Sequence, residues 1–195
     1  MNLHQSRKAN YEIDPVYLER WSSRSFQDKQ VDEPTLFSLF EAARWAPSAN
    51  NLQPWRFIIA RTPESLQTFY RFINEGNLAW CKRAPVLTLV ASEKTTAQGK
   101  PIRSHAFDAG AAWGYLALEA ARKGLVAHAM GGFNKELARD ILAIPDEFDL
   151  HAVVAIGYRG DANLLTPEQQ EREKPSGRRQ IHDSIYMDRF GNTLS

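Results

Sequence analysis

Arg20, Ser22 and Arg24 lie close together in the stretch R-W-S-S-R, where their types and spacing suit anion binding. In an extended segment all three side chains point to one side, and in a helix residues 20 and 24 still share a face. Two guanidiniums with a hydroxyl between them can bind a phosphate or another polar anion. Taken alone, the stretch is also compatible with a solvated helix end.

A second candidate is the loop inside R-W-A-P-S-A-N-N-L-Q-P-W-R-F, residues 44–57. Two prolines restrict its backbone, and Ser48, Asn51 and Gln53 supply hydroxyl and amide groups. Such groups can hydrogen bond to the edge of a heterocycle or to sugar hydroxyls. They can equally satisfy the backbone of a structural turn, so both interpretations stay open.

Two later stretches also have residue types suited to a ligand. H-A-M-G-G-F, residues 128–133, contains paired glycines, which let a backbone approach a flat ligand and leave N–H groups free to donate. K-P-S-G-R-R, residues 174–179, gathers three cations in a tail of mixed charge. Alone, the first is typical of an ordinary turn and the second of a solvated charge cluster.

The sequence contains no G-x-S-x-G motif, no P-loop and no H-E-x-x-H motif. Its five histidines have no metal-ligand spacing with one another or with Cys81. His105 and Asp108 are one helical turn apart, and His182 and Asp183 are adjacent. We expect surface or capping roles for these histidines.

The composition is that of one globular domain, with 195 residues and a hydrophobic content of 43%. A net charge of +1 argues against nucleic-acid binding and against a polybasic membrane surface. The single cysteine excludes an intrachain disulfide, and no run approaches the ~20 apolar residues of a membrane span. The N-terminus lacks the apolar core of a signal peptide. We therefore expect a soluble, cytoplasmic protein.

Predicted helices and strands alternate, which indicates an α/β or α+β sandwich. Hydrophobic periodicity, prolines and capping residues define these elements. Residues 159–195 have little periodicity, so this tail is either disordered or wraps a second subunit. We predict helices over 16–21, 35–46 (ended by Pro47), 64–73, 104–123 (ended by Gly124) and 135–144, and strands over 55–60, 84–92 and 151–158.

In this order and spacing, the segments resemble the FMN-dependent nitroreductases, also called the nitro/flavin reductase family, from about Leu18 to Gly191. R-W-S-S-R-S-F resembles the early R-x-S-x-R-x-F element. A-P-S-A-N-N-L-Q-P-W-R-F resembles A-P-S-x-x-N-x-Q-P-W-x-F, which is the most specific match. D-A-G-A-A-W-G-Y-L-A-L-E-A-A-R-K-G-L resembles the central dimer helix, M-G-G-F the glycine turn beside the flavin, and R-R-Q-I-H-D-S-I the late basic element.

The resemblance implies one FMN-binding domain over residues 1–195 with an α+β fold. The expected architecture is a three-layer sandwich with a mostly antiparallel central sheet flanked by helices, in an intertwined homodimer. The extension from about 159 to 195 would wrap the partner subunit. The implied activity is a ping-pong, two-electron reduction of nitroaromatic, quinone or related acceptors by NADH or NADPH. The chemistry occurs on FMN, so no catalytic side chain or metal is expected.

The family's binding roles transfer to this sequence residue by residue. The early element holds the FMN phosphate and ribityl chain, and the late element helps with the phosphate. The P-S-x-x-N-x-Q loop reaches the flavin from the other subunit, and the glycine turn directs an N–H towards flavin N5. The implied residues are Arg20, Trp21 (through its backbone), Ser22 and Arg24; Pro47, Ser48, Asn51 and Gln53; Asn77 at the pyrimidine edge; Met130, Gly131 and Gly132; and Arg178 and Arg179.

Two positions depart from the family pattern. Trp80 stands where some members carry a lysine, which leaves the charge near flavin N1 to Arg24. Gln180 stands where proline is common, so the late element could be displaced by one residue. The alternatives are a specialised flavoenzyme of the same fold (a dehalogenase, an enone reductase or a flavin-degrading enzyme) and a non-catalytic flavin-binding protein. The sequence does not decide whether residues 94–103 cover the site.

Overall fold

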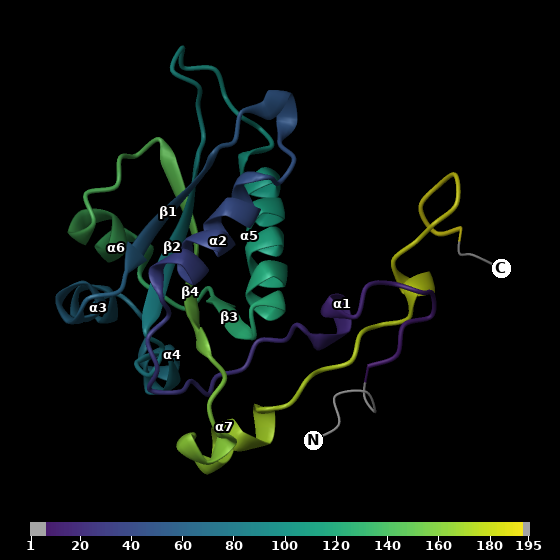
Figure 1. Ribbon diagram of the computed structural model, residues 1–195. Helices are drawn as coiled ribbons and strands as arrows, with labels where there is room; N and C mark the ends of the chain where they lie inside the picture. Colours follow the sequence, from purple (N-terminus) through teal and green to yellow (C-terminus); the bar gives the residue numbers. More distant parts are fainter. Residues whose placement is uncertain (1–6, 193–195) are drawn as a thin grey trace.

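The computed structural model describes residues 7–192 (Figure 1). The strands are β1 (Trp55–Ala60), β2 (Val86–Glu93), β3 (Leu125–Met130) and β4 (Phe148–Tyr158). The α-helices are α1 (Val16–Glu19), α2 (Glu33–Arg44), α3 (Pro63–Tyr70), α4 (Glu75–Cys81), α5 (His105–Arg122), α6 (Lys135–Ile141) and α7 (Pro167–Arg172). Short 3-10 helices cover Ala49–Asn51, Ala162–Leu164 and Ile181–Asp183.

The strands form one sheet in the order β1-β2-β4-β3, and each neighbouring pair is antiparallel. Helices α2 and α5 pack on one face, while α3, α4 and α6 pack on the other (Figure 1). The central strands β2 and β4 are covered on both faces, which explains their nearly continuous apolar sequences. The predicted α+β three-layer sandwich is therefore confirmed.

Local signals explain most element boundaries. Asp32 caps α2 by accepting from the N–H of Thr35, and Thr62 begins α3 with a reciprocal capping box. Gly124, with φ of +72°, follows the end of α5, in the left-handed region that glycine adopts freely. Helix α2 ends at Arg44, two residues before the predicted end at residue 46, so Pro47 does not directly end it.

Helix α4 and strand β3 fall outside the predicted elements. Helix α4 has only seven residues and begins with Glu-Gly-Asn, which are weak helix formers as a group. Strand β3, with the sequence L-V-A-H-A-M, has no clean two-residue alternation because most of it is buried. Strand β4 starts at Phe148, three residues before the predicted position. In these places tertiary burial, which local sequence does not encode, decides the structure.

The two ends of the chain leave the sandwich together as extended arms (Figure 1). At their base the N–H of Gly160 donates to the carbonyl of Ser25 at 2.9 Å. Farther out, the buried guanidinium of Arg7 donates to the carbonyls of Leu18 (2.8 Å), Arg20 (2.7 Å) and Ser176 (3.0 Å). Residues 1–6 and 193–195 of the predicted domain and extension lie outside the described residues. Among residues 7–192, no helix is long and apolar enough to cross a membrane.

Gly160→Ala tests the close contact between the arms. An added Cβ would lie 2.7 Å from the carbonyl carbon and oxygen of Phe26, and backbone cannot move away as a side-chain tip can. We expect a loss of about 1–3 kcal/mol in the free energy of unfolding, measured by urea denaturation. Gly76→Ala is the control, because no atom lies within 4 Å of its added Cβ. Equal destabilisation by both changes would contradict the steric explanation.

Arg7→Ala tests the hydrogen bonds that join the arms. Three carbonyls lose a charged donor, so the arms should separate more often and be cleaved sooner. We expect faster limited trypsin cleavage after Arg178 and Arg179 than in the wild type. Lys8→Ala, which removes a neighbouring cation, is the control. Identical cleavage rates in the wild type and both variants would show that Arg7 does not hold the arms.

Candidate functional site

The stretch from Arg20 to Ser25 has the burial pattern of an extended segment. Ser23 and Ser25 are completely buried, whereas Arg20, Ser22 and Arg24 are partly exposed. The residue Arg20 has extended backbone angles, and its Nη1 donates to Ser22 Oγ at 3.4 Å. Two guanidiniums and a hydroxyl therefore face away from the protein interior.

Arg178 comes close to Arg20 although 158 residues separate them in the sequence. Burial lowers the pKa of Arg20, and repulsion from Arg178 lowers it further. Burial, Arg178 and Arg20 likewise lower the pKa of Arg7. Among residues 7–192, no carboxylate forms an ion pair with Arg20, Arg24 or Arg178. A cluster of guanidiniums without acidic partners is suited to a phosphate or another anion.

The glycine turn after β3 is held by two asparagines. The Gly132 carbonyl accepts from Asn74 N–H at 3.1 Å and from Asn77 Nδ2 at 3.0 Å. A Cβ at position 132 would lie 2.6 Å from Asn77 Nδ2, so a larger residue here would displace this amide. The neighbouring Gly131 N–H has no acceptor within the described chain. The turn thus places Asn77 close to the Gly131 N–H, which is available to donate to a ligand. Met130, which precedes them, is buried.

His128 connects the arginine segment to the core. Its Nδ1 lies 3.0 Å from the Ser23 carbonyl, which can only accept, so Nδ1 carries the proton. The imidazole stacks on Trp80 with ring centroids 4.5 Å apart. Burial lowers the pKa of His128, which favours its neutral form. Trp80 is itself 3% exposed and belongs to the core, so its position contributes no charge to the site.

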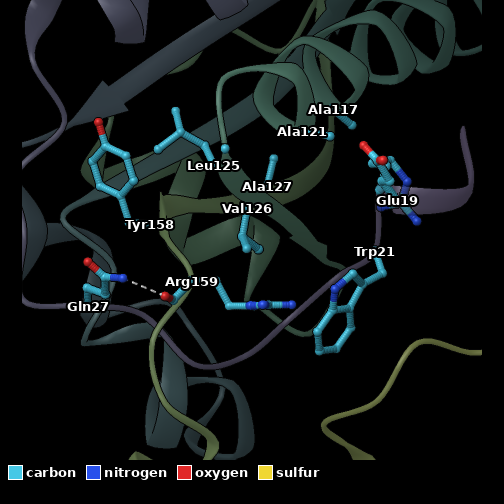
Figure 2. Close-up of a pocket in the computed structure, with 12 residues that line it drawn as sticks. Glu19, Trp21, Gln27, Ala117, Ala121, Leu125, Val126, Ala127, Tyr158 and Arg159 are labelled. Atoms are coloured by element: carbon cyan, nitrogen blue, oxygen red, sulfur yellow. Dashed lines mark hydrogen bonds between the residues drawn. The ribbon is translucent and has the colours of Figure 1, made fainter. Parts of the chain in front are cut away.

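A cavity of about 400 Å³ lies between the arginine segment and the end of α5 (Figure 2). Arg20, Trp21 and Arg159 line it, together with small residues such as Ala117 and Ala121. The Arg159 guanidinium lies 5.9 Å from the centroid of a Trp21 ring, within cation–π range. The volume of this cavity lies in the range of small-molecule binding sites. Arg178 and Arg179 instead line a larger groove between the two arms.

The loop containing Pro47 lies at the opposite end of α5. Ala49 N–H donates to the buried carboxylate of Asp108 at 3.2 Å. Asp108 is thirteen residues from Ala121 on this helix, or about 20 Å along its axis. Within one chain, the loop therefore does not join the arginines; its predicted site residues are Pro47, Ser48, Asn51 and Gln53.

Inside this loop, polar groups bond to one another. Ser48 Oγ accepts from Gln53 N–H at 3.0 Å, and Gln53 Nε2 donates to the Asn51 carbonyl at 3.1 Å. Asn50, Asn51 and Gln53 have positive φ values of 51°, 55° and 48°. Such angles are uncommon outside glycine and persist where the surroundings fix them. The loop is a constrained turn, and this geometry is compatible with a ligand-contacting role as well.

The histidines in this part of the chain have structural partners. Ser92 Oγ lies 2.7 Å from His105 Nδ1 and 2.6 Å from His151 Nε2. Asp108 accepts from Ser104 Oγ at 2.9 Å. No group of three or more His, Cys, Asp or Glu side chains in residues 7–192 could hold a metal ion.

Three residues near the arginine segment were missed by the sequence-based predictions: Arg7, Arg159 and Glu173. Arg7 and Glu173 act on backbone groups of a distant segment, and no local motif marks such a contact. Arg159 follows the end of β4, a position that is defined only once the sheet is known. Long-range pairing therefore assembles this region.

Comparison with known proteins agrees with this geometry. The sequence profile of the nitroreductase family matches residues 17–79 and 70–158. A protein of Thermus thermophilus named NADH dehydrogenase is 32% identical over 176 residues, covering 72% of this chain and 83% of that protein.

Solved structures give the same result. A crystal structure described as an oxidoreductase containing FMN has a TM-score of 0.91 and 41% identity, covering 95% of this chain and 96% of that one. Iodotyrosine deiodinase bound to FMN and 3-iodo-L-tyrosine has a TM-score of 0.65 at 24% identity, covering 91% of this chain and 97% of that one, and this similarity supports the fold alone. On its profile match, its relatives and its fold, the chain belongs to the nitroreductase family.

Proposed function

We propose that this protein is an FMN-dependent NAD(P)H oxidoreductase that reduces nitroaromatic, quinone or related acceptors by two electrons. The observation that carries the proposal is the proximity of Arg20 to Arg178 in arms joined by Arg7, with no carboxylate partner among residues 7–192, in a chain of the nitroreductase family. Guanidiniums bind phosphate in a fork geometry, so the pair suits the phosphate end of FMN. The membership of the family and the FMN-containing structural relative support the same cofactor.

The chain has groups for the other parts of FMN as well. Ser22 lies beside Arg20 and can donate its hydroxyl to the phosphate or ribityl oxygens. The N–H of Gly131 is available for flavin N5, and the remaining amide oxygen of Asn77 suits the pyrimidine edge. The contacts of these segments are spread along β3 and the turn after it. Arg20 lines a cavity with Leu125 at the start of the strand, and Ser23 contacts His128 farther along. Asn77 contacts Gly132 in the turn.

When bound, FMN supplies the redox chemistry of a ping-pong reaction in which NADH or NADPH reacts first and the acceptor second. The residues of the chain position the ring and adjust its charge. The Arg24 guanidinium would favour negative charge on the reduced cofactor near N1 and O2. The Gly131 N–H would orient the ring by donating to N5. The buried Trp80 adds no charge, so Arg24 would supply the positive charge near N1.

A homodimer completes the site in this proposal. The loop with Pro47, Ser48, Asn51 and Gln53 lies about 20 Å along α5 from the arginine end, so it would serve the site of a second copy. The arms carry exposed apolar side chains, such as Tyr17 (55% exposed), that a partner would cover. Cytoplasmic location belongs to the same proposal, because a chain with a single cysteine has no intrachain disulfide of the kind used in oxidising compartments.

The visible spectrum of the purified protein tests the function. We expect a yellow protein whose flavin absorbance disappears on anaerobic addition of NADH or NADPH and returns on addition of a quinone or nitroaromatic acceptor. A non-catalytic flavin-binding protein would stay yellow with both nucleotides. A colourless protein that takes up no supplied FMN would contradict the proposal. Screening halogenated, enone and flavin acceptors with the reduced protein separates the specialised alternatives.

Arg20→Ala tests the phosphate contact. Hydrogen bonds between charged groups contribute about 1.5–3 kcal/mol, so we expect FMN affinity to fall roughly tenfold to a hundredfold. Arg61→Ala is the control, because it also removes one positive charge but breaks only an exposed ion pair with Glu33. Titration of apoprotein with FMN, followed by quenching of flavin fluorescence, measures both. Unchanged affinity in Arg20→Ala would remove this residue from the site.

A further inference from the structure

Glu173, from the end of α7, makes three contacts with the arginine segment. Its Oε2 accepts from the backbone N–H of Arg24 at 2.9 Å, and its Oε1 accepts from that of Ser25 at 3.3 Å. The hydroxyl of Ser23 also donates to Oε1. One carboxylate therefore serves donors from three consecutive residues, about 150 positions earlier in the chain.

These contacts lie on the inner side of the segment. Ser23 and Ser25 are completely buried, while Arg20, Ser22 and Arg24 alternate with them on the outer side. The contacts that hold Ser23 and Ser25 therefore also fix the direction of the arginine side chains on the outer side. Glu173 binds amides and a hydroxyl, and forms no ion pair with the Arg24 guanidinium. The charge of that guanidinium thus stays available to a ligand.

Glu173 is itself held in place. Helix α7 begins with a capping box between Thr166 and Gln169, and Gln170 Nε2 donates to the carbonyl of the buried Leu165 at 2.9 Å. From strand β3, His128 Nδ1 donates to the Ser23 carbonyl at 3.0 Å. The backbone at Ser23 is therefore fixed from the tail and from β3 together.

Glu173 directly precedes the late cluster K-P-S-G-R-R in the sequence. Arg178 follows Glu173 by five residues and comes close to Arg20. We propose that Glu173 is a positioning residue of the cofactor site: by binding the inner side of the segment, it holds Arg20, Ser22 and Arg24 in the extended arrangement that faces the proposed phosphate. The inference rests on the proposed function and adds a residue to it.

The test compares FMN with riboflavin, which lacks the phosphate. Apoproteins of the wild type, Glu173→Ala, Glu173→Gln and the control Glu171→Ala, an exposed residue of the same helix, are titrated with each flavin. We expect Glu173→Ala to bind FMN roughly tenfold more weakly and to bind riboflavin as the wild type does. Glu173→Gln should recover part of the loss, because its amide oxygen still accepts, and Glu171→Ala should match the wild type.

Each other outcome overturns the inference. Unchanged FMN affinity in Glu173→Ala would show that the arginines keep their positions without this carboxylate. An equal loss for FMN and riboflavin would indicate general destabilisation. If Glu173→Ala does not fold, Glu173→Gln decides, and an unchanged ratio of the two affinities rejects the positioning role. A wild type that binds neither flavin refutes the proposed function itself, which separates that failure from failure of this inference.

Discussion

Two charged side chains, Arg7 and Glu173, hold the two arms together by hydrogen bonding to backbone groups. Arg7 donates to carbonyls on both arms, and Glu173 accepts from amides of the early segment. This association brings Arg20 near Arg178; burial lowers the pKa of Arg20, and repulsion from Arg178 lowers it further. Repelling cations held by the fold can bind an anion without much reorganisation, and this preorganisation supports the proposed phosphate site.

The sandwich sets a second constraint through the length of α5. The helix buries one side against β2, β3 and α2, so its ends are fixed relative to the sheet. Asp108 near its start holds the polar loop, and Ala117 and Ala121 near its end line the cavity beside Arg20. One copy of the chain consequently holds the two predicted parts of the site at separate places. This separation supports the proposed homodimer.

Sequence-based prediction succeeded where a short signal decides the structure. Asp32, Thr62 and Gly124 are local cap residues, and α2, α3 and α5 have the expected boundaries to within a few residues. It failed at β3 and α4, where burial against neighbouring elements outweighs weak local preference. For the site, the motif residues could be chosen from type and spacing. Their grouping in space could not be predicted, because only the folded arms bring Arg20 near Arg178.

By itself, the sequence determined the chemical groups and their order: the alternating arginines and serines, the paired glycines and the polar proline-bounded loop. Alternation in an extended segment and the freedom of glycine are local properties, so these features could be read directly. Only the tertiary structure decided that Glu173 and His128 hold the arginine segment, that Trp80 belongs to the core, and that the loop lies at the far end of α5. These results depend on contacts between residues distant in sequence, whose geometry is set by packing of the whole sheet and its helices.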